Sequence, residues 1–216
     1  MGVAPARFPC RRAILPVGTE LGIFLAPRAH NYRSVFFLYA MPSSPLVPNA
    51  IQSNLAVILQ GIRLLEQLGD DRYATRIPLC YNASVGGHMR HIIEHYQSFL
   101  SGVETGEIDY EKRARDPLIE GDPSYARDVL DAIADRFTEL ARHLVNRDLR
   151  LCAETTPGAA TATSVLRELE FLLSHTIHHY ALVAVMARLQ DYEPEPSFGV
   201  APSTLKFQQA QAACAR

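Results

Sequence analysis

The chain has 216 residues, of which 48% are hydrophobic and 20% are charged, and its formal net charge at pH 7 is −2. This composition is typical of a globular protein with one substantial core. A nucleic-acid-binding surface needs clustered lysine and arginine to displace counterions, and the sequence has no long basic run. We therefore expect no nucleic-acid partner.

The cysteines do not form a recognisable motif. They lie far apart and include no CxxC pair, so neither a zinc knuckle nor a disulfide framework is indicated; the four positions are Cys10, Cys80, Cys152 and Cys214. A reducing, cytoplasmic setting is the simplest expectation.

Residues 1–45 differ from the rest of the chain. They contain five arginines and one acidic residue, and Pro and Gly interrupt every apolar run. No run approaches the roughly 18 residues that a membrane span needs, and the break at residues 16–20 does not suit a secretory signal. We expect a disordered extension, or an overlong reading frame whose natural start is Met41. An organelle transit peptide is the alternative.

Helical periodicity begins near residue 48. A first helix is predicted to end near Gly69, and a second to begin at Ser84 as its N-cap and to continue to about Gly106. The apolar stripes of these two helices comprise Ile51, Leu55, Ile58, Ile62 and Leu65, and then Val85, Met89, Ile92, Tyr96, Phe99 and Val103.

Two further helices follow. Asp122 and Pro123 combine a capping carboxylate with proline at the first helical position, and the stripe behind them comprises Ala126, Leu130, Ile133, Phe137, Leu140 and Leu144. Residues 148–163 allow a short hairpin or an ordered loop around Pro157 and Gly158. Ser164 then caps a helix that extends to about residue 190. We predict an all-α, antiparallel four-helix bundle for residues 46–205, followed by a C-terminal tail at 206–216.

Histidines interrupt the apolar face of the fourth helix. Steps of four and three residues place on one line Glu168, Leu172, His175, His179, Leu182 and Met186. An i, i+4 pair of imidazoles at core positions can bind one transition-metal ion. His178 lies to one side of this line, at the seam with a neighbouring helix.

The second helix offers further imidazoles. His88, His91 and His95 lie within about 60° of one another beside its apolar stripe, and the pattern alone does not choose among them. One of them, with the pair from the fourth helix, would hold a divalent ion and leave positions open for water or substrate. A single histidine on such a face is usually a core residue bonded to a backbone carbonyl, but this concentration favours a metal site. His30 and His143 look incidental.

Two stretches, "SVGGHMRHIIEH" at 84–95 and "HTIHHY" at 175–180, resemble the DinB/YfiT-like superfamily of metal-dependent four-helix-bundle enzymes. The resemblance covers about residues 48–205. It implies that His91, seven residues after the capping serine, is the first metal ligand, with His175 and His179 as the pair. It also implies a divalent transition metal such as zinc, nickel or iron.

The chain departs from the family pattern at several positions. Many members have arginine directly after the last ligand, where this chain has Tyr180, so a role of that arginine in holding a substrate anion is not expected here. Residues 198–205, "FGVAPSTL", suit either a loop packed over the mouth of the bundle or a surface turn. Residues 106–116, "GEIDYEKRARD", are expected to be a solvated charged linker, although Tyr110 and Arg113 exceed what a spacer requires.

Family members are similar to thiol S-transferases that use low-molecular-weight thiols. A site with three neutral ligands keeps a net positive charge and lowers the pKa of a bound thiol or water. The resemblance therefore implies thiol transfer to a small-molecule substrate. Metal-dependent hydrolysis and a non-enzymatic metal-binding or dimerising bundle are the alternatives, and a nucleophilic Cys80 is a distant third.

Two carboxylates are candidates to assist the chemistry. Glu168 shares the line of the ligand pair, and Glu94 lies near His91 on the second helix. Either could orient an imidazole N–H or act as general base, and Glu168 is the stronger candidate. We expect no membrane partner, and a homodimer is compatible with the bundle.

Overall fold

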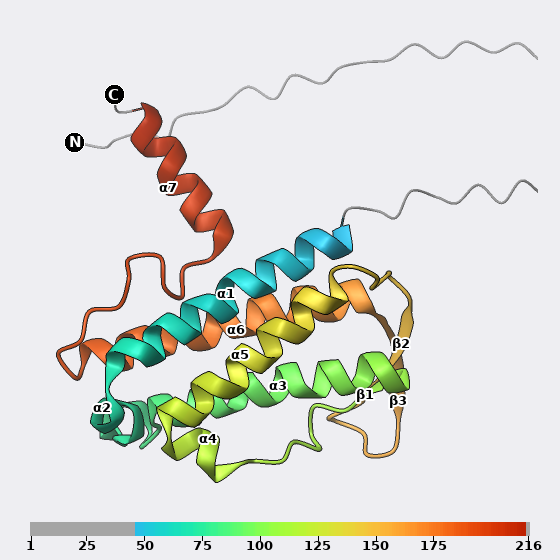
Figure 1. Cartoon of the computed structure of the whole chain (residues 1–216), viewed down its shortest axis with the longest axis horizontal. Coiled ribbons are helices and arrows are strands. Elements are labelled where there is room, and N and C mark those ends of the chain that lie inside the picture. Colours follow the sequence, from blue (N-terminus) through green and yellow to red (C-terminus); the bar gives the residue numbers. More distant parts are fainter. Residues whose placement is uncertain (1–45, 215–216) are drawn as a thin grey trace, which may run out of the picture. The chain divides into compact units, whose positions relative to one another are not determined.

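The computed structural model describes residues 46–214, so the N-terminal extension, Met41 and His30 lie outside the described residues. The described chain is mostly helical (Figure 1). Its four long helices match the predicted segments closely: α1 (Leu46–Leu68), α3 (Val85–Thr105), α5 (Pro123–Leu140) and α6 (Val165–Arg188). Shorter helical elements are α2 (Asp70–Ala74), η1 (Pro78–Cys80), α4 (Pro117–Gly121) and α7 (Pro202–Cys214). Helix α7 spans the predicted boundary at residue 205.

The three predicted N-caps are confirmed. The Ser84 hydroxyl accepts a hydrogen bond from the Gly87 amide at 3.0 Å, and Asp122 caps α5 by accepting from the amides of Ser124 and Tyr125. Ser164 caps α6 in the same way. Each cap satisfies backbone N–H groups that have no partner inside the helix, which is why the sequence located these helix starts well.

A small three-stranded sheet adds to the helices. Strand β1 (Glu107–Ile108) pairs in parallel with β2 (Asp148–Cys152), which pairs antiparallel with β3 (Ala160–Ser164). Of the two alternatives for residues 148–163, a short hairpin or an ordered loop, the hairpin is therefore present, with Gly158 at φ 81° in its turn. The all-α expectation was wrong in this respect, because it did not foresee that the linker after α3 pairs with the hairpin.

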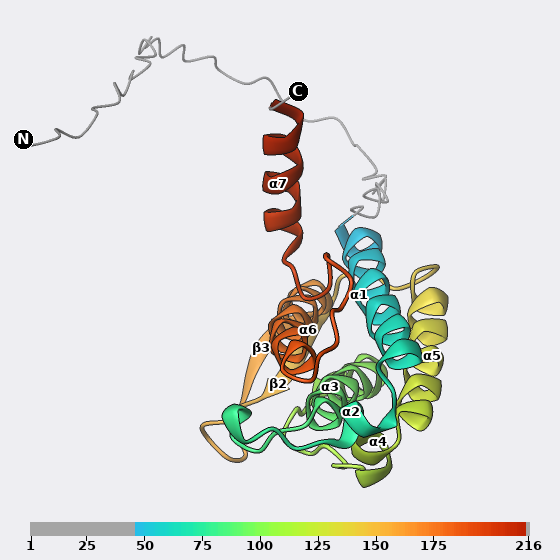
Figure 2. The ribbon, with the colours of Figure 1, turned by 90° about the vertical axis from the view of Figure 1, so that its left-hand side faces the viewer.

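The long helices surround one core. Helix α1 contacts α5 and α6, and α3 contacts the same two helices. In Figure 2, α3 and α6 are seen nearly end-on, with α1 and α5 completing the arrangement. The predicted stripes fill this core, and its largest fully buried side chains include Tyr96, Phe99 and Phe137. No helix within residues 46–214 is both long enough and apolar enough to cross a membrane.

The direction of α6 relative to its neighbours follows from two contacts with α3 and two with α1. His88 of α3 faces His179 of α6. About one turn further along α3, His91 faces His175, so these two helices are antiparallel. By contrast, Asn54 of α1 donates to the Leu169 carbonyl early in α6. Later in both helices, Gly61 of α1 packs against Tyr180 of α6. Helices α1 and α6 are therefore parallel.

Helices α3 and α5 are also parallel. Gly86, at the start of α3, packs against the backbone of Glu120 just before α5. At the other end, Arg136 of α5 pairs with Glu104 of α3 at 2.7 Å. Figure 1 shows α1 and α6 running one way and α3 and α5 the other. The expectation that the helices alternate in direction was wrong for these two pairs, because the linker from α3 to α5 is long enough to return along the whole of α3.

A buried polar network fixes three helices relative to one another. Tyr96 of α3 donates to the Asn54 side chain of α1 at 2.9 Å and accepts from Thr176 of α6 at 3.2 Å. Asn54 in turn donates to the Leu169 carbonyl. All three side chains are fully buried, and such groups are costly unless paired. The network therefore sets the register of α6, and with it the position of His175 beside Thr176.

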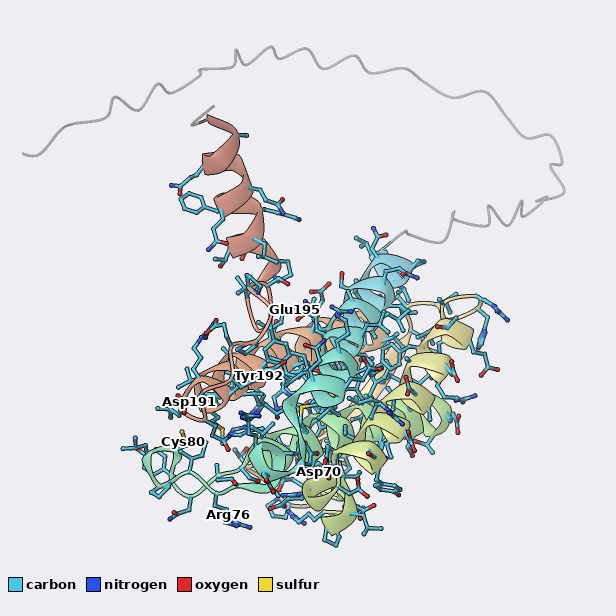
Figure 3. The ribbon with its side chains drawn as sticks, turned by 60° about the vertical axis from the view of Figure 1, so that its left-hand side comes forward. Asp70, Arg76, Cys80, Asp191, Tyr192 and Glu195 are labelled. Atoms are coloured by element: carbon cyan, nitrogen blue, oxygen red, sulfur yellow. The ribbon has the colours of Figure 1, made fainter. Side chains whose placement is uncertain are left out.

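The segment after α6 packs back onto the helices. Phe198 is buried and its ring stacks on Tyr180, with centroids 4.5 Å apart. Tyr192 donates to Gln67 of α1, and Glu195 pairs with Arg63 of α1. Figure 3 labels Tyr192 and Glu195. The beginning of the "FGVAPSTL" stretch is thus packed against α6 instead of forming a free surface turn.

Candidate metal centre

The antiparallel packing of α3 on α6 brings their histidines together. Nε2 of His91 lies 3.1 Å from Nε2 of His175, and Nδ1 of His88 lies 2.9 Å from Nδ1 of His179. Two further ring pairs lie in contact: the His95 and His175 centroids are 4.1 Å apart, and those of His91 and His95 are 4.3 Å apart. The imidazoles form one continuous cluster along the interface.

Three of these side chains form a group that could hold a metal ion. His91, His95 and His175 each offer a nitrogen, and the three nitrogens lie within 4.8 Å of one another. Nδ1 of His95 is 2.7 Å from the His91 carbonyl oxygen. A carbonyl can only accept, so Nδ1 carries the proton and Nε2 keeps its lone pair free for a ligand.

His179, the third ligand that the family resemblance implies, has a different immediate partner. Its ring lies close to both other predicted ligands, with centroids 4.6 Å from His91 and 4.5 Å from His175. Its Nδ1, however, shares a hydrogen bond with His88. The structure thus brings all three predicted ligands into one cluster, and places His95 in the three-residue group with His91 and His175.

Burial keeps the clustered imidazoles neutral. It lowers the pKa of His91 to about 3 and that of His175 to about 2, and in both cases the charge that His95 would carry lowers it further. The pKa of His179 falls to about 4 for the same reason, with His88 as the neighbouring charge. Burial also lowers the pKa of His88 and His95. Neutral imidazole is the form that binds a metal.

The donor set fits a divalent transition metal. Two nitrogens bound to one zinc ion at about 2.0–2.1 Å in tetrahedral geometry are about 3.4 Å apart, which is close to the 3.1 Å between His91 and His175. Nδ1 of His175 is buried and has no hydrogen-bond partner among the described residues. His91 and His175 are half-buried, so the group is not closed off from solvent as a purely structural site would be.

Glu168 is buried, and its hydrogen-bond partners among the described residues do not include a histidine. It is fully buried in the first turn of α6 and accepts hydrogen bonds from Tyr110 at 2.9 Å and from Arg167 at 2.8 Å. The Thr163 hydroxyl also donates to it. The ring of Tyr110 stacks on His95, with centroids 5.0 Å apart. Glu168 therefore reaches the cluster through Tyr110.

Glu94 has a different set of partners. One carboxylate oxygen accepts from the Asp116 amide at 2.8 Å, and the other lies 3.3 Å from Arg90 and 3.7 Å from Arg113. Only 1% of the Glu94 side chain is exposed. These contacts tie the segment between β1 and α4 to the outer side of α3, so Glu94 holds the returning linker.

The returning linker was expected to be a solvated charged run, and part of it is instead packed on α3. Tyr110 lies over His95, and Arg113 is 13% exposed between Glu94 and the Tyr110 carbonyl, to which it donates. Further on, Glu120 pairs with Arg90 at 3.0 Å. The linker is ordered because each of these charged groups finds a partner on α3.

The remaining candidates lie apart from the three-residue group. His178 is exposed, and its ring contacts only that of His179 among the aromatic rings of the described residues. His143 is exposed beyond the end of α5. Cys80 is a free, half-buried cysteine at the end of η1. Leu182 was placed on the ligand line but is 41% exposed, because the buried face of α6 is centred to one side of that line, on Leu172, Thr176 and Val183, and Leu182 lies at its edge.

The sequence placed His95 among the candidate imidazoles of the second helix, but the family resemblance selected His91 alone from them. His91 and His95 have the same i, i+4 spacing as His175 and His179, so this signal could have favoured both as ligands. Tyr110 was noted only as exceeding what a spacer requires, because only the fold of the returning linker brings it to the cluster.

The fold and the site together define a class of protein. It is mostly helical and holds, between two of its long helices, a group of imidazoles that could bind a metal ion. The family model described as the DinB superfamily matches residues 61–183. The chain belongs to the DinB superfamily. Searches among curated proteins and among solved structures gave no match.

Proposed function

We propose that the protein is a divalent-metal-dependent enzyme that activates a small thiol, as thiol S-transferases do, and transfers it to a small-molecule electrophile. The observation that carries the proposal is the convergence of three neutral imidazole nitrogens from His91, His95 and His175, of which His91 and His175 are half-buried. We further propose that α1, α3, α5 and α6 form the four-helix bundle of a DinB-type enzyme, since each contacts two others around one core.

A divalent ion held by uncharged ligands would keep its positive charge and lower the pKa of a bound thiol or water toward neutral pH. The chain contributes the ligands and their orientation. His95 donates its Nδ1 proton to a backbone carbonyl, so its free nitrogen points to the cluster. In this proposal His179, whose Nδ1 now shares a hydrogen bond with His88, is the alternative third imidazole of the centre, so that one position stays open for the thiol or water.

The metal content of the full chain, purified without chelator, tests the binding step. We expect wild type to carry about one equivalent of zinc, nickel or iron, and His175→Ala and His91→Ala to carry little, because each removes a ligand nitrogen. His143→Ala is the matched control, since this histidine is exposed and outside the cluster. Equal metal content in all four proteins would refute the proposed centre.

A second experiment tests the reaction. Loss of free thiol is followed with a panel of small thiols and electrophiles, in wild type, in metal-stripped protein and in His175→Ala. Metal-dependent thiol consumption supports the transferase. Hydrolysis that needs the metal but no thiol would instead indicate a metal-dependent hydrolase. Bound metal without either activity would favour a non-enzymatic metal-binding bundle.

A further inference from the structure

We infer that Tyr110, anchored by Glu168, is a positioning residue that holds His95 as a ligand of the metal centre. The inference rests on the proposed function, because it assigns a task to residues around the proposed metal. It concerns a tyrosine from the returning linker and a carboxylate from the start of α6, neither of which offers a ligand to the group of three histidines.

The ring of His95 is held by two neighbouring rings and by a hydrogen bond at one edge. Tyr110 stacks on one face at 5.0 Å between centroids, with 19° between the ring planes. His175 lies against the ring at 4.1 Å. The edge that carries Nδ1 donates to the His91 carbonyl at 2.7 Å. With these contacts in place, Nε2 is the nitrogen left to face the cluster.

Tyr110 is itself held by Glu168. Its hydroxyl donates to Glu168 Oε2 at 2.9 Å. Phe171 packs beside Tyr110 at 5.2 Å between centroids, which limits sideways motion of the ring.

Glu168 is a fixed anchor. It is fully buried, and Arg167 and Thr163 donate to its other oxygen. A buried carboxylate with three donors has little freedom to move, since losing any hydrogen bond to a buried charge is costly. The chain of contacts from Glu168 through Tyr110 to His95 therefore resists rotation of the imidazole, which is how outer partners of metal ligands act in proteins.

The test uses Co²⁺ as the probe, bound to the full chain in place of the native metal. Its visible absorption reports the number and geometry of its ligands, and titration against a chelator gives its affinity. The variants are Tyr110→Leu, Tyr110→Phe, Glu168→Gln, His95→Ala, and the double variant Tyr110→Leu with His95→Ala. Tyr192→Leu is the matched control, because Tyr192 is also half-buried and hydrogen-bonded but contacts α1 away from the histidines.

We expect Tyr110→Leu to weaken Co²⁺ binding about tenfold, in the range found for outer partners of metal ligands, and to shift the absorption bands as His95→Ala does. Tyr110→Phe and Glu168→Gln keep the stacked ring but weaken its anchor, so they should fall between Tyr110→Leu and wild type. The double variant should bind no more weakly than His95→Ala alone, because Tyr110 acts through that side chain.

Several outcomes would overturn the inference while leaving the proposed metal centre in place. These are unchanged Co²⁺ bands in Tyr110→Leu, an effect equal to that of Tyr192→Leu, or losses that add in the double variant. If Tyr110→Leu does not fold, unchanged bands in Tyr110→Phe and Glu168→Gln have the same meaning. Failure of wild type to bind Co²⁺, or undiminished binding in His175→Ala, would instead refute the proposed function.

Discussion

Replacing Glu94 by glutamine separates a structural from a catalytic role of this carboxylate. The change keeps an oxygen that can accept from the Asp116 amide, but it removes the negative charge that faces Arg90 and Arg113. If Glu94 holds the returning linker on α3, the main effect is a loss of stability. If it is a general base, the main effect is a loss of turnover in a protein of unchanged stability.

The size of the effect follows from burial. Breaking a fully buried ion pair costs about 3–5 kcal/mol, because the remaining charge is left without a partner. Here Arg90 is 22% exposed and keeps its contact with Glu120, while Arg113 is 13% exposed. Solvent therefore screens part of the loss, and we expect the free energy of unfolding to fall by about 2–3 kcal/mol.

Glu104→Gln provides the matched control. Glu104 also lies on α3 and pairs with an arginine, Arg136, but the two side chains are 65% and 46% exposed. Exposed pairs contribute less than about 1 kcal/mol. Urea unfolding of the metal-free proteins gives both free energies, provided that the slope against denaturant concentration is unchanged. A loss in Glu94→Gln no larger than that in Glu104→Gln would refute the structural role.

Two further predictions concern pH and packing. Burial lowers the pKa of His91 and His175 from 6.5 to about 3 and about 2, so below pH 6.5 the unfolded chain takes up protons that the folded protein does not. The free energy of unfolding of the metal-free protein, measured with urea, should therefore be at its full value above pH 6.5 and fall between pH 6.5 and 5. A free energy that does not change over this range would contradict the prediction. At the α1–α6 contact, a Cβ on Gly61 would lie 2.1 Å from the Tyr180 hydroxyl, which is buried and has no hydrogen-bond partner among the described residues. Gly61→Ala should lower the melting temperature, and adding Tyr180→Phe should recover most of the loss; no recovery would show that the hydroxyl is not the obstacle.

Much of the helical structure could be predicted from local sequence. Ser84, Asp122 and Ser164 each bond to amides within three residues, and the apolar stripes repeat at helical spacing. These signals depend only on neighbours along the chain. The same holds for the concentration of histidines on two helices, and for the spacing that placed His175 and His179 on one face.

The direction of the helices and the partners of each site residue were decided by tertiary structure. The sequence did not show that the linker after α3 returns along that helix, because its contacts join residues that are far apart in the chain. Glu94 bonds to Asp116, and Tyr110 to Glu168. Because the linker returns along α3, helix α5 begins beside the start of α3.

The composition of the site divides in the same way. The sequence by itself determined that imidazoles from α3 and α6 would face a common interior. Only the packed structure decided that His95 joins His91 and His175, that His179 meets His88, and that the two carboxylate candidates hydrogen-bond to Tyr110 and to the Asp116 amide and not to an imidazole of the described residues. The physical reason is that helical periodicity fixes the angle of a side chain around its own helix, whereas its partner depends on the register between two helices, which buried contacts such as Tyr96 with Asn54 and Thr176 set.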